Sequence, residues 1–153
     1  MPTPANAPLS MAERLDPTVH AALARSLGSL SHASALMAAS DWALHLAASP
    51  GQRMDLAHLA LRQGQEMAAY ALARMAAGPD KEARHAVATP TQDRRFADPA
   101  WQQWPFNLMH QSFVLSEQWW AAATHGVWGV DKHHEDMVAF AARQFLDIFS
   151  PGN

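Results

Sequence analysis

The chain is notable first for the residues that it has little of. Its 153 residues include no cysteine, one tyrosine and few charged side chains, which make up 16% of the total. Without cysteine, disulfides, thiolate metal sites and a cysteine nucleophile are excluded within this sequence. Only two lysines occur, the net charge is -3, and no basic stripe is present, so we expect no nucleic-acid partner.

Long apolar runs are also missing. No stretch of about 18 apolar residues occurs, so we expect no membrane span. Met1 to Ser10 has neither a basic start nor an apolar run, so no signal peptide is expected and a cytoplasmic protein is the default. Yet hydrophobic residues reach 49%. That proportion, beside so few charges, indicates apolar surface that something else covers.

The residue usage favours an all-α protein. Ile148 is the only isoleucine, valines are scattered, and alanine, the best helix former, dominates. We expect four to five helices in a loose bundle. The expected organisation is a disordered tail (1–15), an Ala/Leu/Met-rich helical segment (16–78), a linker (79–98) and an aromatic-rich helical segment (99–153).

Three helices are expected in the first half: a short one over residues 16–28, and two longer ones over residues 31–48 and 50–77. Ser49 and Gln52 have the spacing of a capping box, with Pro50 at the first helical position. Six residues of the helix expected over residues 50–77 form one apolar stripe: Met54, Ala57, Leu61, Ala68, Leu72 and Met75. This stripe predicts either packing against another helix or contact with an apolar particle.

The second half holds five of the six tryptophans and all six phenylalanines. Helices are expected from Pro105 to about His125 and from Asp131 to Phe149, the latter burying Val138, Ala141, Phe145 and Ile148. Neighbours on a helix point about 100° apart, so Trp119 and Trp120 do not both enter one core. We therefore expect part of this cluster to be an interface. The interaction candidates are Arg94, Arg95, Phe96, Trp101, Trp104, Phe106, Trp119, Trp120 and Trp128.

Residues 93–101 read Asp-Arg-Arg-Phe-Ala-Asp-Pro-Ala-Trp. Asp98 is suited to cap a helix that Pro99 begins, and Phe96 and Trp101 are placed as a hydrophobic staple. Arg94 and Arg95 have two interpretations. They form an anion clamp for a phosphate or a coenzyme A moiety, or they pair with Asp93, Asp98 or a neighbouring domain.

Histidines offer the remaining chemistry. His133 and Asp136 lie one turn apart in the run His-His-Glu-Asp, which suggests a metal site, although acidic residues are ordinary in a first helical turn. His45 and His110 have the right chemistry for a general base, but no nucleophile elbow is present for either to activate. We expect no metal, no cofactor and no catalytic residue in this chain.

The motif at residues 93–101 resembles the N-terminal region of polyhydroxyalkanoate (poly-3-hydroxybutyrate) synthases of class I type. Trp104-Pro105-Phe106, the last helix and Ser150-Pro151-Gly152-Asn153 extend the resemblance, and residues 41–51 are similar to an upstream block of the same synthases. These enzymes polymerise (R)-3-hydroxyacyl-CoA with a Cys, His and Asp of an α/β-hydrolase domain. None of those catalytic residues has a counterpart in this sequence.

The resemblance implies a non-catalytic domain that supports the catalytic domain, dimerisation or attachment to the storage granule. Its expected partners are a synthase catalytic domain or another copy of itself, and also the polyester granule surface or a phasin. The alternative is a stand-alone, phasin-like protein that coats polyester at the granule. A small metalloenzyme built on His133, His134 and Glu135 is the least favoured hypothesis.

Overall fold

The computed structural model describes residues 11, 15–19, 21, 31–77 and 94–152. The chain divides into two compact units, residues 1–37 and 38–153, and each is described by itself. In the first unit, residues 15–19 are helical. All the regular structure of the described residues is helical, which confirms the all-α prediction. The elements are α2 (His32–Ala47), α3 (Pro50–Ala77), the 3₁₀ helix η1 (Pro99–Gln102), α4 (Phe106–Thr124) and α5 (Lys132–Ile148).

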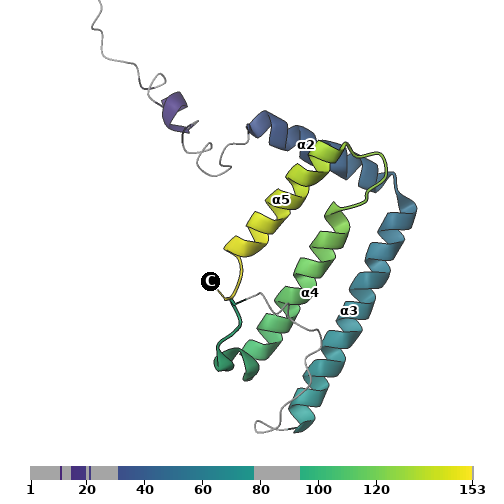
Figure 1. Cartoon of the computed structure of the whole chain (residues 1–153), viewed down its shortest axis with the longest axis vertical. Coiled ribbons are helices and arrows are strands. Elements are labelled where there is room, and N and C mark those ends of the chain that lie inside the picture. The colour runs from purple at the N-terminus through teal and green to yellow at the C-terminus, as the bar shows by residue number, and fades with distance from the viewer. Residues whose placement is uncertain (1–10, 12–14, 20, 22–30, 78–93, 153) are drawn as a thin grey trace, which may run out of the picture. The chain divides into compact units, whose positions relative to one another are not determined.

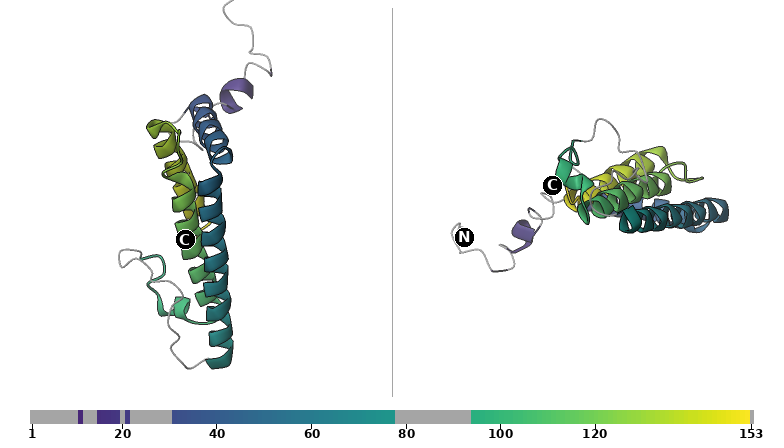
Figure 2. Two further views of the ribbon diagram at one scale, coloured as in Figure 1. Left: turned by 90° about the vertical axis from the view of Figure 1, so that its right-hand side faces the viewer. Right: turned by 90° about the horizontal axis from the view of Figure 1, so that it is seen from below.

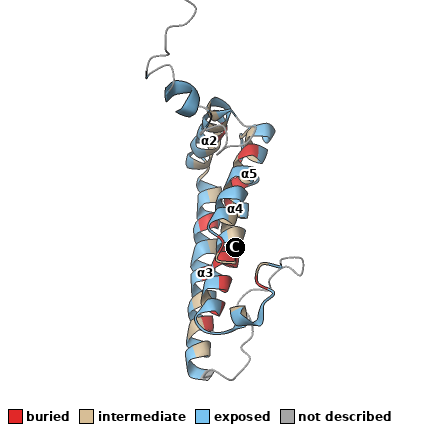
Figure 3. Cartoon of the chain, turned by 90° about the vertical axis from the view of Figure 1, so that its left-hand side faces the viewer, coloured by how far each residue is buried: buried red, intermediate tan, exposed pale blue. Residues whose placement is uncertain are grey.

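In the second unit α3, α4 and α5 lie side by side in one layer, with α4 in the middle (Figures 1 and 2). Helical domains usually bury their apolar stripes between two packed layers. Here the outer helices each have one main neighbour, α4. Figure 3 shows the consequence: much of the helix surface is exposed, and the buried positions are confined to narrow strips. No helix among the described residues has the length and apolarity that crossing a membrane requires.

The limits of the two helices expected over residues 31–48 and 50–77 agree with prediction, but the capping box is wrong; most of the short helix expected over residues 16–28 lies outside the described residues. α2 ends at Ala47 and α3 begins at Pro50. The Ser49 hydroxyl donates backwards to the carbonyl of His45 (2.7 Å). The Gln52 amide reaches across to α4 and donates to the carbonyl of Ala122 (3.1 Å). The local pattern was misleading because the Gln52 side chain has a tertiary partner.

The face of α3 that packs on α4 also differs from prediction. Leu56, Gln63 and Tyr70 are buried at seven-residue intervals. Gln63 donates to the Leu115 carbonyl (3.2 Å), and the side-chain amide of Asn107 donates to the Tyr70 hydroxyl (3.1 Å). The predicted apolar stripe instead faces outwards: Met54, Ala57, Leu61, Ala68, Leu72 and Met75 are all exposed. Its expected packing against another helix is therefore wrong for the described residues.

The predicted burial of α5 is also wrong. Met137 is its one buried residue, while Phe145 and Ile148 are 59% and 71% exposed. Val138 is half-buried and Ala141 is exposed. The helix limits are as expected, since Asp131 caps α5 by accepting from the amides of His133 and His134. The error has a simple physical cause. A helix at the edge of a single layer buries only the strip that faces its neighbour, however wide its apolar stripe.

Candidate functional site

The turn at residues 94–98 is the point where the carboxyl-terminal half of the second unit is held together. Phe96 is 3% exposed. Its ring stacks on His110 (4.2 Å between centroids), meets Trp101 edge-on (5.0 Å) and contacts Phe113 (5.8 Å). Asp98 caps η1 by accepting from the amide of Ala100 (2.8 Å), with Pro99 next to it. The predicted cap and hydrophobic staple are both confirmed.

Arg95 adds two ion pairs to these aromatic contacts. Its guanidinium donates to Glu117 on α4 (2.7 Å) and to Asp147 on α5 (3.1 Å). It also lies 5.1 Å from the Phe113 ring, within the range of a cation–π contact. Asp98, one of the two partners that the sequence suggested, instead caps η1, and the other, Asp93, lies outside the described residues. Because two carboxylates already engage Arg95, the arrangement favours a structural role over an anion clamp; Arg94 is exposed.

The last residues pack directly on this turn. A Cβ atom added to Gly152 would lie 2.9 Å from the carbonyl oxygen of Arg95 and 3.1 Å from the Phe96 ring. A side chain at this position therefore requires a shift of the backbone. Glycine allows residues 150–152 to close against the Arg95–Phe96 turn, which fixes the end of α5 beside the start of α4.

Beside this anchored end, the C-terminal half of α5 presents an uncovered apolar surface. We call Ala141, Phe145, Ile148 and Phe149 the α5 face. Phe149 is 65% exposed, and its ring lies 4.7 Å from that of Phe145. At the amino end of the helix the same side is covered, since Met137 is buried. The apolar stripe of α5 therefore runs from a covered end to an open one.

A second exposed aromatic group lies where α4 begins. Trp104 is 65% exposed and Phe106 is 47% exposed. Trp101 is half-buried and meets Phe106 edge-on (5.9 Å). Because α4 begins at the end of the layer where α5 finishes (Figure 1), this group and the α5 face occupy the same end of the second unit. Exposed apolar groups that gather at one end of a unit are typical of a surface that binds a partner.

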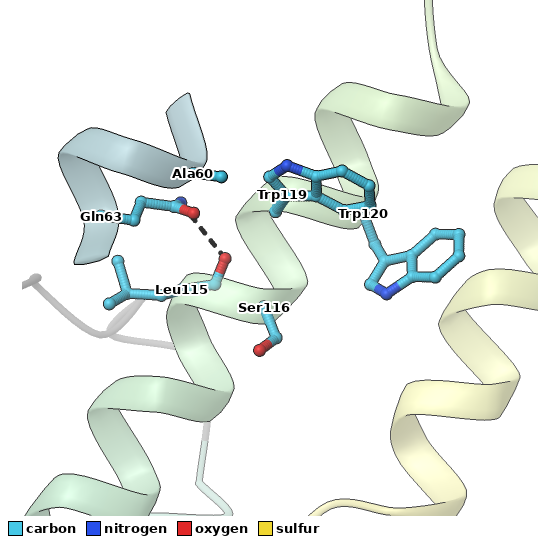
Figure 4. A pocket seen from close by; sticks show the side chains of 6 residues that line it. All are labelled: Ala60, Gln63, Leu115, Ser116, Trp119 and Trp120. Carbon is cyan, nitrogen blue, oxygen red and sulfur yellow. Dashed lines mark hydrogen bonds between the residues drawn. The ribbon is translucent and has the colours of Figure 1, made fainter. Parts of the chain in front are cut away.

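Trp119 and Trp120 leave α4 in different directions, as Figure 4 shows, and their rings meet edge-on with 5.5 Å between centroids. Trp119 faces α3 and donates to the Leu56 carbonyl (3.2 Å). The Trp120 ring lies 6.5 Å from that of Trp42, whose indole donates to the Ala123 carbonyl (2.8 Å). Both are half-buried, so their main contacts are within the chain, whereas Trp128 is 88% exposed.

An open hollow of about 260 Å³ lies between α3 and α4 beside these rings (Figure 4). Its lining contains no titratable side chain: it consists of Ala60, Gln63, Leu115, Ser116, Trp119 and Trp120. The Ser116 hydroxyl donates to the Ser112 carbonyl. The hollow has hydrogen-bonding groups but no acid, base or activated nucleophile, so it does not suggest a reaction.

His134, one residue of the His-His-Glu-Asp run that suggested a metal site, contacts Asp41 of α2 together with His45. Nδ1 of His134 lies 2.7 Å from Asp41, and Nδ1 of His45 lies 2.9 Å from the same carboxylate. Since carboxylate oxygens accept, both histidines carry the hydrogen on Nδ1. Donation from His134 and from the Asp131 amide lowers the pKa of Asp41 below its ordinary 3.8. This cluster joins α2 to the start of α5.

The neighbouring Glu135 also has hydrogen-bond partners within the chain. It accepts from Lys132 (2.7 Å) and from the amide of Gly126 (2.7 Å), and both bonds lower its pKa. The carboxylates of Glu135 and Asp136 in turn raise the pKa of Lys132. Among the described residues, no group of three or more histidine and acidic side chains is arranged to hold a metal ion.

Parts of the chain are similar to known proteins. A family model described as the N terminal of poly-beta-hydroxybutyrate polymerase matches residues 10–52, and the poly-beta-hydroxybutyrate polymerase (PhaC) N-terminus matches residues 92–153. The chain is 35% identical over 68 residues to the poly(3-hydroxyalkanoate) polymerase of Methylorubrum extorquens. That match covers 44% of this chain but 11% of the relative, so the chain spans a small part of that protein. No solved structure matches the chain.

Proposed function

We propose that this chain, which carries both N-terminal regions of the poly-beta-hydroxybutyrate polymerases, is a non-catalytic docking region for the catalytic part of such a polymerase. Polymerases of this kind transfer hydroxyacyl units from coenzyme A thioesters to a growing polyester. In this proposal the chemistry belongs to the catalytic part, since the chain contains no cysteine to carry an acyl group. The chain contributes a surface that orders the catalytic part or its approach to the polymer.

The observation that carries the proposal is the uncovered α5 face. Phe145, Ile148 and Phe149 are each more than half exposed, beside the anchored turn of Arg95 and Phe96. Apolar surface in a fixed geometry favours association with another protein surface, because burying it releases water without a large ordering cost. Arg95 and Gly152 supply that fixed geometry by holding α4, α5 and the last residues together.

Two assays test the proposal with the catalytic part of a poly(3-hydroxyalkanoate) polymerase produced separately. We expect the chain and the catalytic part to co-elute, and coenzyme A release from hydroxybutyryl-CoA to increase when the chain is added. The double variant Phe145→Ser/Ile148→Ser should abolish both effects. Phe140→Ser is the matched control, because Phe140 is 55% exposed but lies about 140° from Phe145 and about 80° from Ile148 around the axis of α5.

The outcomes are distinct. Co-elution that the α5-face variant weakens, with the control unchanged, supports the docking role. Absence of binding together with an unchanged rate contradicts it, and so does coenzyme A release by the chain alone.

A second candidate is a phasin-like role, in which the chain coats polyester by itself. The exposure of apolar residues on α3 as well as α5 favours it, since Met54, Leu61 and Leu72 are at least 60% exposed. Incubating the isolated chain with washed polyhydroxybutyrate granules tests this role directly. Recovery with the granules supports it, and recovery in the supernatant counts against it.

A further inference from the structure

Residues 38–47 of α2 are attached to the rest of the second unit mainly by polar contacts. Ala38 is the buried residue of α2, and Leu44 is 70% exposed. The half-buried Trp42 donates from its indole to the Ala123 carbonyl, at the end of α4. A helical segment with little buried apolar surface opens locally at a low free-energy cost. None of these residues belongs to the α5 face, so this feature goes beyond the proposed function.

The second attachment is the carboxylate of Asp41, which two histidines share. Nδ1 of His134 on α5 lies 2.7 Å from Oδ2 of Asp41, and Nδ1 of His45 lies 2.9 Å from Oδ1. The backbone amide of Asp131 also donates to Oδ2 (3.2 Å). We call Asp41, His45 and His134 the histidine clasp.

The two histidines differ in what their contact with Asp41 joins. His45 follows Asp41 by four residues on the same helix, so this pair forms whether or not α2 is attached to α5. His45 also lies in the last turn of α2, where the helix dipole stabilises a positive charge. His134, in contrast, meets Asp41 only while the two helices are attached. His134 is therefore the histidine whose protonation changes the attachment.

Protonation of His134 changes the type of contact. Histidine ordinarily titrates near pH 6.5. Above that pH a neutral Nδ1–H donates to Asp41, and below it the same contact is an ion pair, to which the attraction of opposite charges is added. The two side chains are 25% and 21% exposed, so water screens the charges only in part. We propose that the histidine clasp is a pH-sensitive switch, which holds residues 38–47 of α2 on α5 more tightly below about pH 6.5 than above it.

Other titratable groups surround the clasp. The loop before α5 and its first turn contain five of them: His125, Asp131, Lys132, His133 and Glu135. Aspartate, glutamate and lysine ordinarily do not titrate between pH 5.5 and 8.5. Here Asp131 caps α5 and Glu135 pairs with Lys132. Of the two histidines, His125 contacts the Ala121 carbonyl, whereas the exposed His133 ring lies 6.3 Å from that of His134. His133 is therefore the neighbour whose titration a test must separate from that of His134.

Two effects limit the size of the change. A protonated His45 shares the carboxylate with His134 and repels a second positive charge, and the positive end of the α5 dipole opposes charge in its first turn. Partly exposed ion pairs shift an equilibrium by up to about 5-fold. We therefore expect the attached state of residues 38–47 to be favoured about 3- to 5-fold more at pH 5.5 than at pH 8.5.

Release of residues 38–47 exposes a defined part of the unit. Ala48 and Ser49 are not helical and separate α2 from α3, so α2 moves without unwinding α3. Ala123, which is 0% exposed, and the Trp120 ring beside Trp42 then become accessible. The clasp thus links pH to the exposure of the end of α4.

Amide hydrogen exchange of the full chain at pH 5.5, 7.0 and 8.5 tests the inference, with each rate corrected for the intrinsic rate at that pH. We expect the amides of residues 41–47 to be about 3- to 5-fold more protected at pH 5.5 than at pH 8.5. The amides of residues 63–70, in the middle of α3, are the internal reference, and their protection should not follow this change.

Three variants assign the change to its group. His134→Asn keeps a neutral N–H donor near the position of Nδ1, so the contact should remain at pH 8.5 while the gain at pH 5.5 is lost. His133→Asn, at the exposed neighbouring position, is the matched control and should keep the gain. Asp41→Asn removes the carboxylate and should leave residues 41–47 weakly protected at all three pH values. Circular dichroism checks that the variants retain their helices.

Three results overturn the inference. The first is equal protection of residues 41–47 at pH 5.5 and 8.5 in the natural chain. The second is a gain in protection that His134→Asn leaves intact, because another group then responds to the pH. The third is loss of the gain in His133→Asn, which assigns the response to the exposed neighbour.

Discussion

Replacing Phe96 by alanine should remove the largest single contribution of the 94–98 turn to stability. The ring is 3% exposed and lies against His110, Trp101 and Phe113. Truncating a buried phenylalanine costs about 3–5 kcal/mol, through lost burial and the cavity that remains. For a unit of this size, the total free energy of unfolding is about 6–17 kcal/mol. Phe96→Ala should therefore remove a large part of it.

The assay is urea unfolding followed by tryptophan fluorescence. With an m-value of about 2 kcal/mol per M, the midpoint should fall by about 2 M while the m-value stays constant. Phe96→Leu keeps most of the volume and should cost about 1–1.5 kcal/mol, chiefly the lost aromatic contacts. Phe140→Ala is the matched control at a 55% exposed position and should change stability by less than about 1 kcal/mol. A shift below about 0.5 M for Phe96→Ala would refute the view that this turn anchors the unit.

Three further predictions concern the contacts that position the helices. The lowered pKa of Asp41 means that its contribution to stability is present above pH 3.8 and is lost as the pH falls through the folded pKa. The variant Asp41→Asn should therefore lose less unfolding free energy on acidification than the natural chain. An equal loss in both proteins contradicts this. Gly129→Ala should destabilise by about 1–3 kcal/mol in thermal melts, because φ is +91° and the added Cβ would lie 2.5 Å from the His45 ring. Arg95→Met should lower the free energy of unfolding, measured in urea, by about 1–3 kcal/mol, because Glu117 then loses its charged partner in a partly buried position. An unchanged urea midpoint would contradict this and indicate that water solvates the ion pair.

The sequence predicts the elements of this fold well because their boundaries are local. Pro50 begins α3, Asp131 caps α5 and Asp98 caps η1, each through residues within three positions of the helix start. The staple between Phe96 and Trp101 is equally local. Short-range geometry of this kind is encoded in a few adjacent residues, and no tertiary information is needed to recognise it.

The buried faces were not predictable in the same way. Apolarity pointed to Leu61 and Leu72 as the inner side of α3, but Gln63 and Tyr70 occupy it because they hydrogen-bond to α4. Likewise, Ile148 has the pattern of a core residue and is exposed because α5 lies at the edge of a single layer. Periodicity locates an apolar stripe but does not say what covers it. Here the missing cover is itself the indication of an interaction surface.

Hydrogen exchange of the chain, alone and with the polymerase catalytic part, tests most directly whether that part covers the α5 face. Residues 141–149 lie at an exposed helix end, so their amides should exchange readily in the isolated chain. We expect the catalytic part to slow exchange over this segment and to leave residues 38–47 of α2 unchanged. Equal exchange over residues 141–149 with and without a saturating amount of the catalytic part would contradict the docking role.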